Sequence, residues 1–225
     1  MIIENLVVGP FQVNCYVIYP GPGCDAVVID PGDDPEEILS LLSSRHLNVT
    51  HIINTHGHGD HIGANRPLKQ AFPAAKIAIH HRDAHMLTDA RANFSLDFNF
   101  TVTSPPADLL LEGNTELSAA GATLRIEHVP GHSPGSICII PDFSPRVVFT
   151  GDALFAGSIG RTDFPGGNMG LLVASINEKI LTLPGDTVVC PGHGVRTTVD
   201  VEKRNNPCLS ACAGTDGPPA SPDPD

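Results

Sequence analysis

The chain has 225 residues, of which 41% are hydrophobic and 17% are charged, a size and composition typical of a globular protein with a sizeable core. No apolar run approaches the length of a membrane span, and the N-terminus has no export signal, so we expect a cytoplasmic protein without membrane contact. The 13 Lys and Arg against 25 Asp and Glu give a net charge of -12, which disfavours nucleic acid as a partner. The sequence does not define an oligomeric state.

The first half of the sequence predicts a meander of short strands followed by alternating helices and strands. Apolar, β-branched runs between Gly and Pro residues predict strands at 2–8, 13–19, 26–29, 50–54 and 76–80. Asp34-Pro35 and the apolar stripe after it predict a helix over 35–46, and further helices are expected at 63–72 and 82–87. Residues 88–107 are irregular and predict a long loop near an opening.

The second half predicts strands near Leu117 and at 123–128, 136–140, 147–150 and 187–190, with helices at 168–183 and 198–206. Helices occur in both halves and strands outnumber them, which predicts packed sheets with helices outside, a layered α/β fold. Residues 1–207 are predicted to form one domain. The Pro-rich, acidic remainder, 208–225, is predicted to be a disordered tail.

The cysteines indicate reduced thiols, whereas the number of histidines indicates metal binding. Six cysteines, at 15, 24, 138, 190, 208 and 212, are too sparse for a disulfide framework and are expected to be reduced thiols, with Cys15 filling a strand. Eleven histidines, against two tyrosines and no tryptophan, are an unusual excess. The excess directs attention to metal chemistry.

The strongest motif is THGHGDH at residues 55–61, directly after an apolar strand. A turn at the carboxyl end of a strand can point several side chains inward, and we expect the small Gly57 and Gly59 to relax the backbone there. A polar loop with chance histidines is the alternative interpretation. It is disfavoured because similar turns recur downstream. The potential metal ligands of this motif are His56, His58, Asp60 and His61.

Three further strand ends carry potential ligands of the same kind. His132 lies in VPGHSPG, Asp152 in FTGD and His193 in PGHG, and each follows a predicted strand. Together with the first motif, four strand ends carry five His and two Asp. This ligand set is the one expected of zinc or iron rather than magnesium or calcium.

The order of these residues resembles the ligand pattern of the metallo-β-lactamase superfamily, and the match extends over residues 1–207. The resemblance implies a four-layer αβ/βα sandwich. The segments 149–155, 160–167 and 191–194, together with Asn206-Pro207, are similar to the glyoxalase II (hydroxyacylglutathione hydrolase) branch. The chain is most similar to a short form of that branch, without the helical C-terminal domain.

The resemblance also implies roles for the ligands. His56, His58 and His132 would hold one divalent metal ion, Asp60, His61 and His193 a second, and Asp152 would bridge them. The expected ions are two zinc ions, with iron or manganese as alternatives. The implied reaction is hydrolysis of a small-molecule thioester or related ester by a hydroxide that bridges the ions. Asp60 is expected to be a metal ligand first, with orientation of the hydroxide as a second, catalytic role.

Other members of the superfamily provide alternatives. Ala153 stands where many lactamases have Cys, flavodiiron relatives usually have Glu in place of His58, and nuclease relatives carry insertions and basic surfaces, so these three classes are disfavoured. The persulfide dioxygenases, which use a single iron and share the GRTDF segment at 160–164, are the main rival enzymes. A non-enzymatic metal sensor or scaffold is a further alternative, although it would not need seven ligands.

Weaker candidates lie outside this set. His80, His81 and His85 are interpreted as a solvated helix face, and Cys208 and Cys212 as free thiols.

Arg161, in the Gly-rich loop after Asp152, is predicted to bind the acidic end of a substrate, because a guanidinium can clamp a carboxylate. A salt bridge to Asp163 is the alternative for Arg161.

Overall fold

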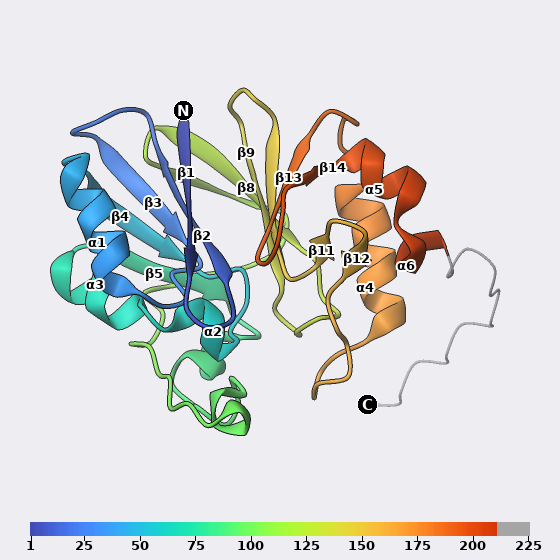
Figure 1. Ribbon diagram of the computed structural model, residues 1–225, viewed down its shortest axis with the longest axis horizontal. Helices are drawn as coiled ribbons and strands as arrows, with labels where there is room; N and C mark the ends of the chain where they lie inside the picture. Colours follow the sequence, from blue (N-terminus) through green and yellow to red (C-terminus); the bar gives the residue numbers. More distant parts are fainter. Residues whose placement is uncertain (211–225) are drawn as a thin grey trace.

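Two mixed six-stranded sheets pack face to face in the computed structural model, which describes residues 1–210 (Figure 1). The first sheet has the order β1 (Ile2–Val8), β2 (Val13–Tyr19), β3 (Asp25–Ile29), β4 (Asn48–Ile53), β5 (Lys76–His80) and β6 (Leu109–Leu111). The second has the order β14 (Thr197–Thr198), β13 (Val188–Pro191), β10 (Val147–Gly151), β9 (Ile137–Pro141), β8 (Ala122–His128) and β7 (Thr115–Ala119). A small hairpin joins β11 (Leu154–Phe155) and β12 (Ser158–Ile159).

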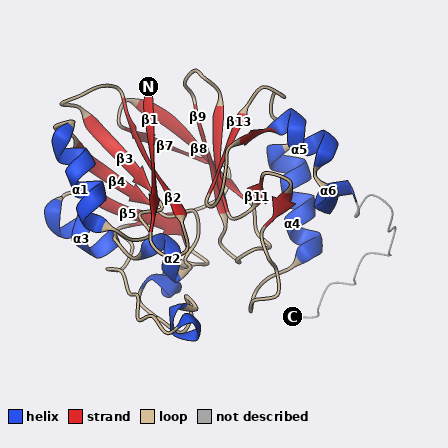
Figure 2. Ribbon diagram, in the orientation of Figure 1, coloured by secondary structure: helices blue, strands red, loops and turns tan. Residues whose placement is uncertain are grey.

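Helices cover the outer faces of both sheets (Figure 2). Beside the first sheet lie α1 (Pro35–Ser44) and α3 (Asn65–Ala71), and beside the second lie α4 (Met169–Ser175), which continues as the π-helix η3 (Ile176–Ile180), α5 (Val199–Asn205) and α6 (Pro207–Ser210). Three single-turn helices lie in the loops of the first half: α2 (Gly59–Ile62), η1 (Ala84–Leu87) and η2 (Ser95–Phe98). The order helix, sheet, sheet, helix confirms the predicted layered α/β sandwich.

Three apolar clusters account for the four layers. The middle cluster lies between the two sheets, where Tyr16 and Phe149 meet edge to face with ring centroids 5.0 Å apart. A second cluster packs the other face of the first sheet against α1, through residues such as Ile38 and Leu42. The third packs the second sheet against α4 and η3, through residues such as Leu172. Because β2 contributes to two of these clusters, all seven of its residues are buried.

Strand direction brings the predicted ligand-bearing turns together. Strands β3, β4, β5 and β6 run parallel to one another, and so do β10 and β13. Because parallel strands end at the same edge of a sheet, the turns after β4, β10 and β13 open on one side of the sandwich. The turn after β8 joins them there, since β8 and β10 both pair antiparallel with β9.

Several predicted boundaries were wrong. The predicted helix 63–72 is confirmed as α3, which is shorter at both ends, whereas the single turn α2 before it was not predicted. A side chain at Gly63, between the two, would meet the carbonyl oxygen of Gly32. The predicted helix 82–87 is the shorter 3-10 turn η1, and the predicted helix 168–183 ends in the π-helix η3 at Ile180. Strands β6, β11, β12 and β14 were not predicted, since two or three residues are too few to display alternation.

The C-terminal prediction falls mostly outside the described part. Residues 208–210 lie in α6 rather than in a tail, and residues 211–225, with Cys212, lie outside the described residues. Within residues 1–210, no helix is long and apolar enough to cross a membrane. The other five cysteines are free, and Cys15 is buried in β2 as predicted.

Candidate metal centre

The seven predicted ligands converge between the two sheets. The first four follow β4, with Asp60 and His61 already in the single turn α2, whereas His132, Asp152 and His193 follow β8, β10 and β13. Their side chains form three overlapping groups in which the ligand atoms all lie within 4.8 Å of one another. These groups are His56, His58 and His132; His56, His61 and Asp152; and Asp60, His61 and His193.

The first group consists of imidazoles. His58 Nδ1 lies 3.0 Å from His132 Nε2, and the rings of His56 and His132 stand edge to face with centroids 4.8 Å apart. The Nε2 atom of His56 is buried and has no hydrogen-bond partner within residues 1–210. A buried polar atom without a partner is costly, so this nitrogen is suited to a ligand or an ion.

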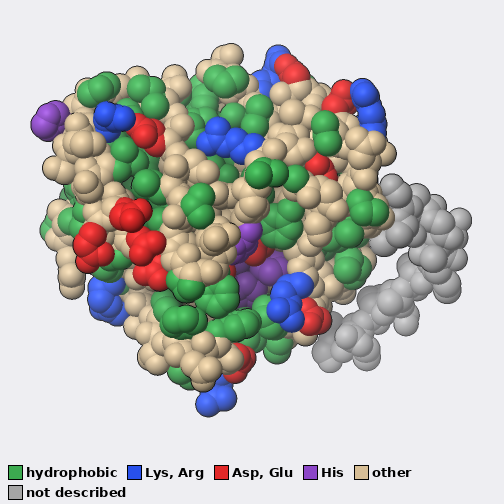
Figure 3. Space-filling model, viewed as in Figure 1, with side chains coloured by type: hydrophobic (Ala, Val, Ile, Leu, Met, Phe, Trp, Pro, Cys, Tyr) green, Lys and Arg blue, Asp and Glu red, His purple; other side chains and the backbone are tan. Residues whose placement is uncertain are grey.

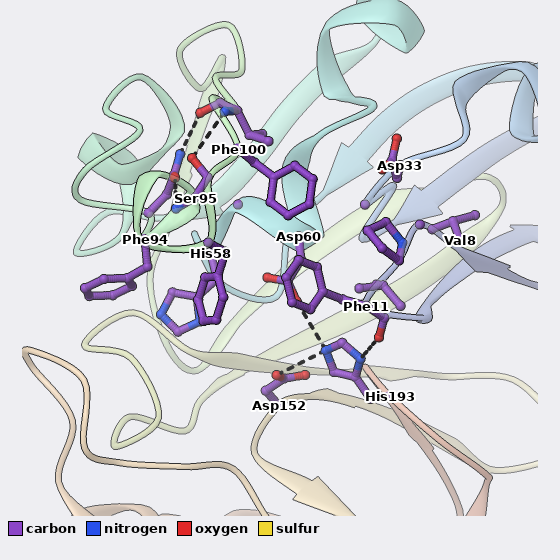
Figure 4. A pocket seen from close by; sticks show the side chains of 18 of the residues that line it. Val8, Phe11, Asp33, His58, Asp60, Phe94, Ser95, Phe100, Asp152 and His193 are labelled. Carbon is purple, nitrogen blue, oxygen red and sulfur yellow. Dashed lines mark hydrogen bonds and ion pairs between the residues drawn. The ribbon is translucent and has the colours of Figure 1, made fainter.

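Asp60, His61 and His193, called the second group from here on, add a carboxylate, and Asp152 lies between them and the first group. His193 Nε2 lies 3.4 Å from Asp60 Oδ2 and 3.5 Å from Asp152 Oδ2, contacts drawn in Figure 4. His61 Nε2 lies 3.3 Å from His193 Nε2 and 3.4 Å from Asp152 Oδ1. On the other side, Asp152 Oδ2 is 3.7 Å from His132 Nε2. Ligands about 2.0–2.2 Å from a tetrahedral metal ion lie roughly 3.3–3.6 Å apart, which is the scale of these separations.

Partners outside the cluster orient the imidazoles. The Thr55 hydroxyl donates to Asp30 Oδ2 at 2.6 Å, so its oxygen is left to accept from His56 Nδ1 at 3.1 Å. Backbone carbonyls orient two further rings. The Arg161 carbonyl accepts a hydrogen bond from His132 Nδ1 at 2.8 Å, and the Phe11 carbonyl accepts one from His193 Nδ1 at 2.9 Å. A proton held on Nδ1 leaves the Nε2 lone pair of a neutral ring pointing into the cluster, as a metal ligand requires.

Burial keeps His56 and His58 neutral. Burial, with neighbouring His61 and His58, holds the pKa of His56 well below its ordinary value, and burial beside His132 lowers the pKa of His58 to about 3. Both rings therefore present lone pairs at neutral pH. Two such acceptors 3.0 Å apart, as in His58 and His132, need a cation or a proton between them.

In the second group, neighbouring carboxylates raise the pKa of a histidine instead of lowering it. Burial opposes charge on His193, but hydrogen bonds to Asp152 and Asp60 outweigh it and raise its pKa to about 9. Burial likewise favours the neutral form of Asp152, yet His61 and His193 hold the Asp152 pKa well below its ordinary value. This part of the site therefore favours a positive charge, which a proton or a metal ion can supply. The donor set, the orphaned nitrogen of His56 and this field all fit divalent cations.

Two supporting carboxylates were missed by sequence reasoning. Asp30, at the end of β3, accepts from the Thr55 backbone N–H at 2.7 Å and lies 3.1 Å from His61 Nδ1, so it supports ligands of both groups. Its position at a strand end is the same signal that identified Asp152.

The second supporting carboxylate, Asp83, is fully buried. It accepts hydrogen bonds from Ser133 Oγ at 2.6 Å, Gly135 N at 2.6 Å and Gly57 N at 3.1 Å. Asp83 thus ties the turn that carries His132 to the turn between His56 and His58. No spacing pattern in the sequence marks it.

The two glycines of the motif act differently from the prediction. Neither Gly57 nor Gly59 has a positive φ, so they do not relax the backbone. Instead, added β-carbons would lie 2.6 Å from Met86 Cβ and 2.7 Å from Ser95 Cβ, respectively. They permit the close approach of the η1 and η2 segments to the site.

The weaker histidine prediction was partly wrong. His80 ends β5, is buried, and stacks on His128 with ring centroids 4.1 Å apart, so it is not on a solvated helix face. His81 and His85 are exposed as predicted. Sequence spacing could not show that β5 points His80 toward the second sheet.

Arg161 lies at the edge of the site. Its guanidinium makes two 2.7 Å contacts with the Asp163 carboxylate and stacks over the Phe164 ring at 3.9 Å. This is the contact named by the alternative interpretation. It favours that alternative over substrate recognition, and the kinetics of Arg161→Ala decide between the two.

A cavity of about 500 Å³ opens over the cluster. In Figure 3 histidine surface is visible at the bottom of a hollow whose rim is largely hydrophobic, with cationic and acidic surface beside it. The cavity reaches His58, Asp60, His132, Asp152 and His193, so a small molecule in it would touch both ligand groups. The predicted long loop contributes part of the wall, which confirms its place near an opening.

Comparison with known proteins identifies relatives along nearly the whole chain. Hydroxyacylglutathione hydrolase GloC of Haemophilus influenzae is 38% identical over 214 residues, which cover 94% of this chain and 99% of that protein. The probable metallo-hydrolase YqgX of Bacillus subtilis is 39% identical over 208 residues, which cover 92% and 97%.

Solved structures show the same fold. The crystal structure of BLEG-1 B3 metallo-beta-lactamase has a TM-score of 0.88 at 39% identity, covering 93% of this chain and all of that one. The crystal structure of TTHA1623 in a di-iron-bound form has a TM-score of 0.78 at 36% identity, covering 91% and 98%. The model of the Metallo-beta-lactamase superfamily matches residues 8–193. The chain therefore belongs to the metallo-β-lactamase superfamily, whose members are generally metal-dependent hydrolases.

Proposed function

We propose that this protein is a metal-dependent hydrolase that cleaves thioesters, such as acylglutathiones, or related esters of small acids. The observation that supports it most is the pair of three-ligand groups with Asp152 between them, because two cations are then held side by side. The similarity to hydroxyacylglutathione hydrolase GloC supports the thioester class. The cytoplasmic location expected from the sequence stays a prediction.

The proposed ligands divide as the sequence resemblance implies. His56, His58 and His132 would hold one ion, Asp60, His61 and His193 the other, and Asp152 would contact both. Zinc is the first choice, and iron or manganese are the alternatives. The similarity to a protein crystallised in a di-iron-bound form supports iron as an alternative.

Two bound divalent ions would acidify a water molecule and polarise the scissile carbonyl. The chain's own residues would supply the rest. Thr55 and the Arg161 carbonyl hold two imidazoles in the ligating tautomer, and Asp152 contributes negative charge between the groups. Asp60 lines the cavity, so its carboxylate could also accept a hydrogen bond from the attacking water and orient it.

The test combines two measurements. Elemental analysis gives the metal content of the protein, and kinetics give the turnover of acylglutathiones and of acyl thioesters of the neutral thiol N-acetylcysteamine. We expect two equivalents of metal per chain, hydrolysis that a chelator abolishes, and recovery on adding metal back. A metal-replete sample that never exceeds one equivalent would favour the mononuclear dioxygenase. Two equivalents without turnover of any ester would favour a sensor or scaffold.

Hydrolysis of β-lactams is the second candidate function. The similarity to BLEG-1 B3 metallo-beta-lactamase, at 39% identity, favours it more than the sequence motifs do. The same metal-loaded sample should therefore be assayed with nitrocefin. Turnover of nitrocefin with no turnover of thioesters would replace the first proposal by the second.

A further inference from the structure

The cavity over the candidate metal centre has aromatic walls. Of the nine phenylalanines in the sequence, six line this cavity: Phe11, Phe94, Phe98, Phe100, Phe155 and Phe164. They come from the loop after β1, the long loop around η2, the strand β11 and the loop after β12. Phenylalanine is thus concentrated at the one place where a substrate would enter.

Three of these rings form a wall beside the second ligand group. Phe11 stands edge to face with Phe98, with centroids 5.4 Å apart, and with Phe100, with centroids 5.8 Å apart. Each of the three residues is 40–43% exposed, although such rings are usually covered. The Phe11 carbonyl accepts from His193 Nδ1, which fixes this wall relative to the cluster. Figure 4 shows Phe11 and Phe100 among the side chains that line the cavity together with Asp60.

Free positive charge is missing from the cavity. Among its lining residues, all of which are described, Arg161 is the one Lys or Arg, and Asp163 already engages its guanidinium at two points. Asp33 adds an exposed carboxylate to the lining. The cavity therefore offers no unpaired Lys or Arg to bind a thiol that carries several carboxylates. It does offer phenylalanine rings against which an apolar ring can pack.

We propose that the substrate carries an aromatic acyl group, which lies against Phe11, Phe98 and Phe100. This inference rests on the proposed function, because the scissile carbonyl must sit at the metal centre. The acyl group and the thiol sulfur are both bonded to the carbonyl carbon, so both begin beside the metal centre. In the proposed complex the acyl group points to the aromatic wall and the thiol toward solvent. The aromatic wall, fixed next to His193, is therefore in reach of the acyl group.

The experiment separates binding from turnover. Phenylacetate and acetate are titrated calorimetrically into the metal-loaded protein, and phenylacetyl and acetyl thioesters of N-acetylcysteamine are compared by kcat/KM. Burying a phenyl ring against apolar surface predicts about tenfold tighter binding of phenylacetate and a similar preference in kcat/KM. Cyclohexylacetate should bind about threefold or more weaker than phenylacetate, because it lacks the edge-to-face contacts.

Phe98→Ala should lower phenylacetate affinity about tenfold and reduce the preference for the phenylacetyl thioester by a similar factor. Leu96→Ala is the matched control, since Leu96 is 40% exposed in the same turn η2 but does not line the cavity. It should change neither ratio.

The outcomes distinguish the two proposals. Hydrolysis of the acetyl thioester with no tighter binding of phenylacetate would overturn the aromatic inference and leave the proposed function standing. Phe98-dependent binding of phenylacetate with no hydrolysis of any thioester would support the aromatic site and reject the hydrolase. Faster turnover with a glutathione thiol than with N-acetylcysteamine, and no acyl preference, would also overturn the inference.

Discussion

The two ligand groups of the site use similar residues in different environments. The imidazoles of His56, His58 and His132 are nearly inaccessible, and no carboxylate belongs to their group. In the other group, the side chains of His193 and Asp60 are 26% and 24% exposed, and the carboxylate balances a positive charge. Burial lowers the pKa of His56 and His58, whereas carboxylates raise the pKa of His193, so the two positions should respond differently to substitution.

Asp152→Asn should have the largest effect, because it removes the one carboxylate within residues 1–210 that contacts both groups. We expect at least a hundredfold loss of kcat/KM, on the order of the upper end seen for residues around metal sites, and fewer than two equivalents of bound metal. Steady-state kinetics and elemental analysis measure both. His85→Ala, a change at an exposed histidine outside the cluster, is the control. Equal effects of the two substitutions would contradict the central place of Asp152.

Asp83→Asn should act on the buried group alone. Both oxygens of the Asp83 carboxylate accept hydrogen bonds from N–H or O–H groups. In Asn one oxygen is replaced by an NH₂ group, which cannot accept, so at least one of these hydrogen bonds is lost. The turns that carry His56, His58 and His132 should loosen as a result. We expect a roughly tenfold to hundredfold weaker affinity at one of the two metal positions, measured by chelator competition, with the other unchanged.

Asp89→Asn is the matched control for Asp83, because Asp89 also accepts backbone hydrogen bonds, from Arg91 and Ala92, but is exposed and does not line the cavity. Equal weakening of both metal positions in Asp83→Asn would show that Asp83 supports the whole site rather than one group.

Arg161→Ala should have the smallest effect. The backbone carbonyl that accepts from His132 survives the substitution, and the lost side chain is half-exposed and already paired with Asp163. We expect a threefold or smaller loss of kcat/KM that is equal for acidic and neutral thioesters. An increase in KM confined to acidic thioesters, with kcat unchanged, would instead establish Arg161 as a recognition residue and weaken the aromatic inference.

The convergence of the seven candidate ligands could be predicted from the sequence because these residues follow strands of the sheets. A buried strand is recognisable from its apolar run, and a polar residue at its end has one predictable position, the edge of the sheet. Asp152 and His193 were placed in this way, and Asp30 could have been. The layered fold followed from the same alternation of strands and helices.

The sequence by itself thus determined which side chains meet at the site and which layers hold them, since both depend on local periodicity. Tertiary structure alone decided what surrounds them. Asp83 bridges the turns at Gly57 and Ser133, which are 76 residues apart. His80 is buried against a strand of the other sheet, and the rings of Phe11 and Phe98 form one wall from loops 87 residues apart. Such contacts leave no spacing pattern, because they join segments whose approach is fixed only when the two sheets pack.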